Sequence, residues 1–205
     1  YKMFSSMKSF YYLFMLVLLC SLLSCEPIKE VEDETVYERT NKNYGNDIEL
    51  LSTKFDLPQE YLKALIILES SGNKKVPPRY EAHVFQKLVK LRNNQLVSYE
   101  KLKPYHVKDA TDDALKNLST SWGPFQIMGY KCLELGVSVS DLRGDSAVYW
   151  GVYWINKEYG QYLKRKKYTE AFKIHNTGSP TGETYDSKYV SKGLSHINYF
   201  ERLKN

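Results

Sequence analysis

The feature that most constrains this chain is an apolar run that ends in a carboxylic acid. Residues 64–72 read Ala-Leu-Ile-Ile-Leu-Glu-Ser-Ser-Gly. A helix over 58–70 has no polar stripe, so we expect it to be buried in a core. Glu69 would then lie at the carboxyl end of a buried helix, where desolvation and the helix dipole both disfavour the anion. A carboxylic acid held protonated is what a glycosidase general acid requires, although most glutamates are simply solvated.

The amino-terminal residues have the pattern of a lipoprotein signal peptide over 1–24. Lys8 precedes an apolar stretch over 10–19 that is too short to span a membrane comfortably. The residues Leu-Leu-Ser-Cys at 22–25 resemble a bacterial lipobox, which implies cleavage before Cys25 and lipidation of that cysteine. The alternative is an ordinary secretory signal in which Cys25 is incidental. The expected location is the bacterial cell envelope, with a lipid-anchored protein facing the periplasm or the exterior.

We predict an acidic, disordered tether over 25–45 and one domain over 46–205. The tether holds six carboxylates and few large apolar groups. The domain, at about 160 residues, is long enough for one hydrophobic core. Cys132 has no partner if Cys25 carries lipid, so no disulfide framework is expected. The net charge of +5 is modest and scattered, which suits an anionic polymer such as the cell wall and is no signature of nucleic-acid binding.

The spacing of apolar residues predicts a mainly α-helical domain. Residues Phe125, Met128 and Cys132 fall at helical spacing, so the turn at 121–124 is expected to lead directly into a helix. No stretch alternates convincingly, and any sheet should be small. Further helices are predicted over 47–55, 58–70, 81–91, 109–118, 145–163, 168–174 and 189–203. The residues Asn-Thr-Gly at 176–178 are expected to end the helix that starts at 168.

Three segments together resemble the lytic transglycosylase (SLT) domain of the lysozyme-like superfamily. They are Glu-Ser-Ser-Gly at 69–72, Gly-Pro-Phe-Gln-Ile-Met at 123–128 and Ala-Phe-Lys-Ile-His-Asn-Thr-Gly at 171–178. The family has a Glu-Ser pair at a helix end, then Gly-Leu-Met-Gln-Ile-Met, then Ala-Tyr-Asn-x-Gly and a downstream tyrosine. The resemblance covers about residues 55–200. Segments 79–85 and 121–129 look instead like phage-type N-acetylmuramidases, which cleave the same glycan bond.

This resemblance implies a lysozyme-like fold with a carbohydrate groove. The expected substrate is peptidoglycan, cut at its MurNAc-β-1,4-GlcNAc bond to leave a 1,6-anhydro product. Glu69 would act as general acid and then as base. The residues that would bind the substrate are Ser70, Gln126, Met128, Asn176 and Tyr189. We expect a monomer that needs no cofactor and contacts the membrane only through the lipid on Cys25.

Departures from the family pattern keep other functions open. His175 stands where the family has a tyrosine, and Pro124 and Phe125 replace Leu-Met. In a hydrolytic muramidase the second carboxylate that activates water could be Glu81 or one of the aspartates at 109, 112 and 113. Glu81 could equally be an ordinary helix amino-terminal carboxylate favoured by the dipole. A lipoprotein that binds glycan without cutting it is a third possibility. The four histidines show no metal-ligand spacing, so no metal is expected.

Overall fold

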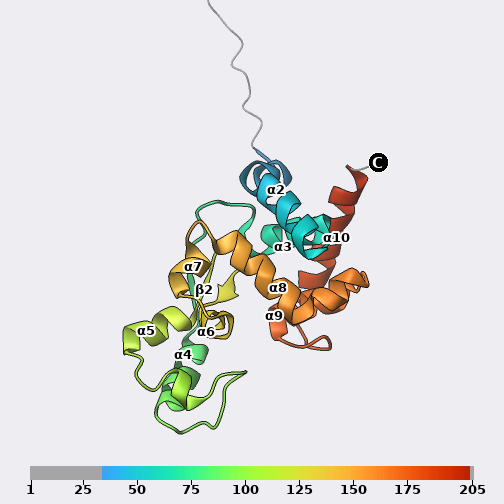
Figure 1. Cartoon of the computed structure of the whole chain (residues 1–205). Helices are drawn as coiled ribbons and strands as arrows, with labels where there is room; N and C mark the ends of the chain where they lie inside the picture. Colours follow the sequence, from blue (N-terminus) through green and yellow to red (C-terminus); the bar gives the residue numbers. More distant parts are fainter. Residues whose placement is uncertain (1–33, 204–205) are drawn as a thin grey trace, which may run out of the picture. The chain divides into compact units, whose positions relative to one another are not determined.

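The structure is a computed structural model that describes residues 34–203, and within this range it is mainly helical with a small sheet (Figure 1). The predicted signal peptide, the lipidation site at Cys25 and the first part of the tether lie outside the described residues. No helix between residues 34 and 203 is both long and apolar enough to cross a membrane. The elements are α2 (Val36–Phe55), α3 (Gln59–Ser70), β1 (Arg79–Tyr80), α4 (Ala82–Arg92), the 3-10 helix η1 (Pro104–His106), α5 (Asp112–Leu118), β2 (Thr120–Trp122), β3 (Ile127–Met128), α6 (Lys131–Leu135), α7 (Val139–Arg143), α8 (Ala147–Lys164), α9 (Tyr168–Thr177) and α10 (Tyr189–Arg202).

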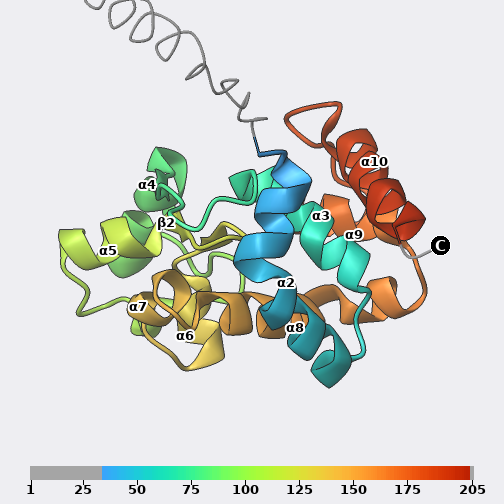
Figure 2. The ribbon, with the colours of Figure 1, turned by 90° about the horizontal axis from the view of Figure 1, so that it is seen from above.

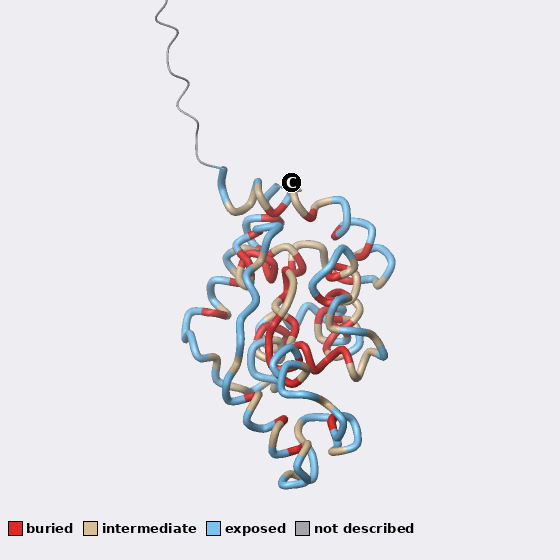
Figure 3. The backbone as a smooth tube through the Cα atoms, turned by 90° about the vertical axis from the view of Figure 1, so that its left-hand side faces the viewer, coloured by how far each residue is buried: buried red, intermediate tan, exposed pale blue. Residues whose placement is uncertain are grey.

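The larger part of this domain, which we call the helical half, consists of α2, α3, α8, α9 and α10. Helix α3 packs against both α2 and α10, while α9 packs against α8 and α10 (Figure 2). Five residues of α3 are entirely inaccessible to solvent, which confirms the prediction that 58–70 forms a core helix. Buried stretches, red in Figure 3, lie in the interior of the domain, and exposed ones follow its periphery. The apolar run thus forms the centre around which the other helices pack.

The prediction of a disordered tether up to residue 45 is wrong for its second part, because α2 already begins at Val36. A capping box starts the helix: the Thr35 hydroxyl accepts from the backbone N–H of Glu38, and the Glu38 carboxylate accepts from the N–H of Thr35. Thr40 and Tyr44 are then buried one turn apart, on the face that packs against α3. The buried stripe of α2 extends across the predicted boundary between residues 45 and 46. Because residues 26–38 are acidic, the first part of this stripe was assigned to the tether.

The smaller part, which we call the sheet half, comprises the three strands with η1 and the helices α4 to α7. The sheet is antiparallel in the order β1-β2-β3, with Arg79 opposite Ser121 and Ser121 opposite Met128. A helix starting directly after the 121–124 turn was predicted, and this is wrong. Gly123 and Gln126 have φ of 70° and 48°, so the chain reverses between β2 and β3 and no helix forms before Lys131.

Candidate active site

A cavity of about 710 Å³ is lined by residues of both halves of the domain. It brings together three segments that are far apart in the sequence: the end of α3, the β2–β3 turn with β3, and the end of α9 with the start of α10. Six residues singled out from the sequence line it: Glu69, Glu81, Gln126, Met128, Asn176 and Tyr189.

Glu69 is the penultimate residue of α3, and its side chain is 9% exposed. The hydroxyl of Tyr189, the first residue of α10, donates to Glu69 Oε1 at 2.5 Å. Burial, and after it the negative charge that Glu69 carries when it is ionised, raise the pKa of Tyr189, so the phenol stays protonated and serves as the donor. The packing of α10 on α3 therefore fixes one oxygen of the Glu69 carboxyl group, Oε1. The hydrogen bond from Tyr189 does not involve the other oxygen, Oε2.

His175 lies beside this pair and is held in one tautomer. Its Nε2 is 3.0 Å from the carbonyl oxygen of Phe125, which can only accept, so Nε2 carries the proton. Its Nδ1 then accepts from the hydroxyl of Tyr159 at 2.8 Å. Burial lowers the pKa of His175, which keeps the ring neutral. The distance from Nε2 to Glu69 Oε1 is 3.8 Å, too long for a hydrogen bond, so His175 is a neutral neighbour of the carboxyl group.

Glu81 approaches the same cavity from the sheet half. Its Oε1 accepts from Arg79 Nε at 2.8 Å, and its Oε2 lies 3.7 Å from His83 Nδ1. Glu81 occupies the cap position of α4, but its side chain makes no capping hydrogen bond. Its backbone N–H donates to Ser119 O at 2.9 Å, which ties it to the sheet. The carboxylate is therefore oriented by Arg79 rather than by the helix amino terminus.

Gln126 and Met128 form the part of the cavity nearest the sheet. The Gln126 side-chain amide donates to the carbonyl oxygen of Gly123 at 3.1 Å, which closes the turn between β2 and β3. Met128 is half-buried and packs against the core while also lining the cavity. The preceding Phe125 ring is fully buried against Gly151 of α8, where a Cβ would lie 2.4 Å from the ring. The Phe at this position is therefore a packing residue that anchors the turn.

Of the two remaining predicted contacts, Ser70 and Asn176, only Asn176 lines the cavity. Ser70 does not line the cavity: it is buried, and its hydroxyl donates to the carbonyl oxygen of Ile66 within α3 at 2.8 Å. The expected contact between Ser70 and substrate is thus not provided by this arrangement. Asn176 does line the cavity and is exposed at the end of α9. Gly178, with φ of 78°, ends that helix by donating from its backbone N–H to Ile174 O, as the sequence predicted.

Sequence reasoning missed a charged group at one end of the cavity. Lys131 is buried, and its ammonium pairs with Glu100 at 3.2 Å and with Glu134 at 3.3 Å. It also lies 5.7 Å from the ring centre of Trp154, which contacts the ring of His175 edge-on. Glu100 has φ of 53°, at a tight turn. No pattern within one sequence links residues 100 and 131, because only the tertiary fold makes them neighbours.

The described residues include no group of three or more His, Cys, Asp and Glu side chains placed to hold a metal ion. The cavity's own side chains offer one carboxyl group fixed by a phenol, one carboxylate fixed by a guanidinium, and amides that can bond to hydroxyl and amide groups.

Comparison with solved structures shows the fold. The chain aligns with the crystal structure of the Burkholderia AP3 phage endolysin at a TM-score of 0.56 and 17% sequence identity, covering 78% of this chain and 71% of that chain. No protein-family model matches the chain, and no curated protein matches it either. The described domain thus shares its fold with that endolysin, and the expected mainly helical fold with a small sheet is confirmed.

Proposed function

We propose that this protein cleaves the MurNAc-β-1,4-GlcNAc bond of peptidoglycan, with Glu69 as the general acid. The observation that carries the proposal is the placement of Glu69 at the end of a core helix, inside a cavity of about 710 Å³, with one carboxyl oxygen held by Tyr189. The fold supports it, since a phage endolysin has the same architecture at low identity. Amide and apolar side chains beside Glu69 suit a sugar chain with acetamido groups.

For the reaction we propose the lytic route. Glu69 gives its proton from Oε2 to the glycosidic oxygen, the C1–O bond breaks with its electrons on the leaving sugar, and an oxocarbenium-like centre develops. The resulting carboxylate then takes the proton of the muramoyl 6-hydroxyl, whose oxygen bonds to C1. This closes a 1,6-anhydro ring and restores the acid, so no water is consumed. Tyr189, bonded to Oε1, leaves Oε2 to carry the proton in both steps.

The substrate contacts proposed are those of the cavity. The amides of Gln126 and Asn176 would bond to the sugar, and Met128 would provide an apolar wall. One N–H of the Gln126 amide already donates to Gly123 O, so its carbonyl oxygen and its second N–H remain to bond to a sugar hydroxyl or acetamido group.

A hydrolytic muramidase is the second candidate, and Glu81 favours it. This carboxylate lines the same cavity as Glu69, where it could activate a water molecule. Against this, Glu81 Oε1 already accepts from Arg79 at 2.8 Å, which occupies part of its capacity as a base. The two reactions leave different ends on the glycan: an anhydro-muramoyl end for the lyase and a reducing end for the hydrolase.

Mass spectrometry of digested peptidoglycan tests the proposal. The purified domain should release anhydro-muropeptides, and Glu69→Gln should release none while still binding glycan strands. Glu49→Gln is the matched control, because Glu49 is exposed on α2 and does not line the cavity. Reducing ends in place of anhydro ends would establish the muramidase. Undiminished digestion by Glu69→Gln would remove Glu69 from the reaction, and glycan binding without any digestion would leave the non-catalytic reading.

We extend the proposal to the location of the protein, on the sequence of residues 1–25 alone. A lipid on Cys25 would anchor the domain to a membrane of the bacterial envelope, where its substrate lies. Growth with labelled palmitate should mark the intact protein and leave Cys25→Ala unlabelled and released from membranes. Labelling of the Cys25→Ala variant would contradict this assignment.

A further inference from the structure

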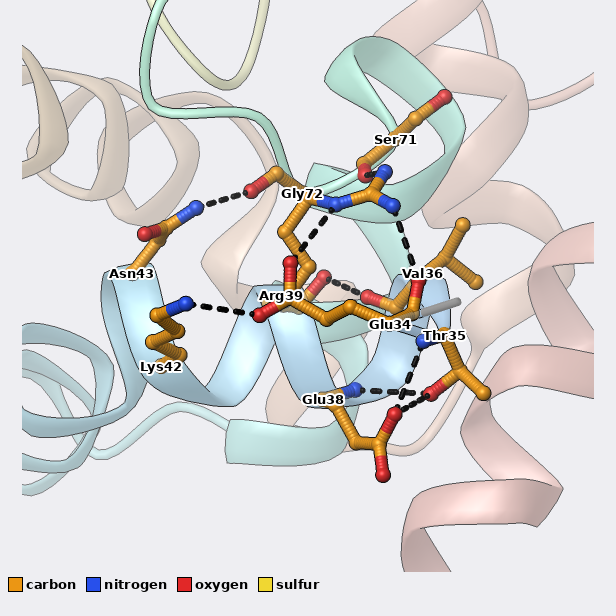
Figure 4. Close-up of polar contacts among 10 residues, drawn as sticks. Glu34, Thr35, Val36, Glu38, Arg39, Lys42, Asn43, Ser71 and Gly72 are labelled. Atoms are coloured by element: carbon orange, nitrogen blue, oxygen red, sulfur yellow. Dashed lines mark hydrogen bonds and ion pairs between the residues drawn. The ribbon is translucent and has the colours of Figure 1, made fainter. Parts of the chain in front are cut away.

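Three successive carbonyl oxygens directly after the Glu69–Ser70 end of α3 are each held by a side chain of α2. Arg39 Nη1 donates to Ser71 O at 3.3 Å, and Asn43 Nδ2 donates to Gly72 O at 2.8 Å. The Tyr44 hydroxyl donates to Asn73 O at 2.6 Å. Figure 4 shows Arg39 and Asn43 reaching from α2 to Ser71 and Gly72. We call residues 71–73 the exit loop of α3.

The exit loop has an unusual backbone that α2 also shapes by direct contact. Ser71 and Gly72 both have left-handed φ, of 53° and 72°, so the chain turns sharply within three residues of Glu69. A Cβ on Gly72 would lie 2.4 Å from Thr40 Oγ1 and 3.0 Å from Thr40 N. Only glycine allows the loop to approach the α2 backbone this closely. The loop is therefore fitted to α2 and not free in solvent.

The spacing of the donors along α2 is that of one helix face. Arg39 and Asn43 are four residues apart, as are Thr40 and Tyr44, so all four side chains lie on neighbouring ridges. Glu34 orients the first donor, because its Oε2 lies 3.3 Å from Arg39 Nε and its Oε1 lies 3.0 Å from Lys42 Nζ. The capping box at Thr35 fixes where the helix starts and thereby which residues face the exit loop.

We propose that Asn43 and Tyr44 are positioning residues for Glu69, acting through the exit loop. This inference rests on the proposed function. The last turn of a helix has carbonyl groups without helical partners and opens readily. In α3 that turn carries Glu69. It is closed by hydrogen bonds from Ser71 N–H to Ile67 O and from Asn73 N–H to Ser70 O. The carbonyl oxygens of Ser71 and Asn73 are in turn bound by side chains of α2. Tyr189 thus fixes the end of the Glu69 side chain, while α2 fixes the backbone from which it extends.

The test combines kinetics with hydrogen exchange in two variants. Asn43→Asp keeps the size of the side chain but replaces a donor with an acceptor facing Gly72 O, and Tyr44→Phe removes only the hydroxyl. Both should lower kcat between about tenfold and a hundredfold with KM little changed, because the acid is displaced while the glycan contacts remain. Both should also speed amide exchange at Ser71 and Asn73 without affecting α8 or α9. Ser52→Ala is the matched control, since Ser52 bonds to Glu49 O within α2 and should leave both readouts unchanged.

The outcomes separate this inference from the proposed function. Unchanged exchange at the exit loop in both variants, or faster exchange with unchanged kcat, would overturn the positioning role. If Asn43→Asp fails to fold, Tyr44→Phe decides alone. If the unaltered protein digests no peptidoglycan, the proposed function fails. A positioning role for Glu69 then fails as well, because it presupposes that reaction. The exchange data would in that case report only whether α2 holds the exit loop.

Discussion

The two walls of the cavity, one from the helical half and one from the sheet half, are held together by different kinds of interaction. In the helical half, Glu69, His175 and Tyr189 have little exposure and are joined by hydrogen bonds to phenols and a backbone carbonyl. In the sheet half, Arg79 and Glu81 form an ion pair at 2.8 Å, with the Arg79 side chain 63% exposed. Neutral, buried donors can fix a carboxyl group without supplying a counter-charge, whereas an exposed ion pair orients but is screened by solvent. Under the proposed function, the first wall would transfer the proton and the second would orient the substrate.

Removing the Tyr189 hydroxyl should have the largest effect. In Tyr189→Phe the Glu69 carboxyl group loses its fixed oxygen, so we expect kcat to fall by about tenfold to a hundredfold with KM nearly unchanged. Release of muropeptides measures this. Tyr105→Phe is the control, because that side chain is exposed in η1 and does not line the cavity. Full activity of Tyr189→Phe would remove the proposed distinction between the walls.

Glu81→Gln should have a smaller effect if the sheet wall only orients the glycan. We expect a loss of less than about tenfold, since a general base would instead contribute 10²–10⁴-fold. The measurement is kcat together with the end group of the product. Glu183→Gln, in an exposed loop outside the cavity lining, controls for the loss of one negative charge. A loss above a hundredfold with reducing ends would assign the water-activating base to Glu81 and establish the hydrolase.

The stability of the helical wall should depend on pH through His175. Burial lowers its pKa in the folded protein below the usual value of about 6.5, so the unfolded chain binds more protons as the pH falls. The stability from this group is complete above about pH 7 and is lost as the pH drops through the folded pKa. Denaturant titrations at pH 7 and pH 5 should show a smaller loss in His175→Gln than in the unaltered protein. Burial also lowers the pKa of His196, but this residue is present in both proteins, so its contribution to the loss of stability cancels. Equal losses of stability in the two proteins would contradict the prediction.

The smallest expected effect comes from replacing two residues that have a left-handed backbone conformation, Ser71 near the helical wall and Gln126 near the sheet wall. Ser71→Gly and Gln126→Gly each relieve a positive φ and should each gain up to about 1 kcal/mol in unfolding free energy. Gln126→Gly also loses the side-chain bond to Gly123 O and the proposed sugar contact, so its net gain should be smaller and its KM higher. Thermal unfolding with KM measurements tests the pair. A raised KM in Ser71→Gly alone would contradict the assignment of glycan contacts to Gln126.

The sequence alone determined much of the helical half. A helix-length segment with an apolar run and no polar stripe indicates a core helix, so the burial of α3 and the position of Glu69 at its end were predicted. The helices α8, α9 and α10 also followed from apolar spacing, and Gly178 marked a helix end. These are local properties, which 3.6-residue periodicity and backbone preferences encode within a few turns of chain.

Only the tertiary structure decided what surrounds Glu69. The helix predicted over 47–55 is only the second half of α2, and the acidic start hid the first half because its buried stripe has meaning only against α3. The β2–β3 turn was misread because Phe125 and Met128 also suit a helix. The neutral state of His175 depends on the distant Tyr159 and Phe125, and the inward direction of the Ser70 hydroxyl depends on its rotamer. Periodicity reports which face of a segment is buried, but not which partner buries it, and the partners are what give this cavity its chemistry.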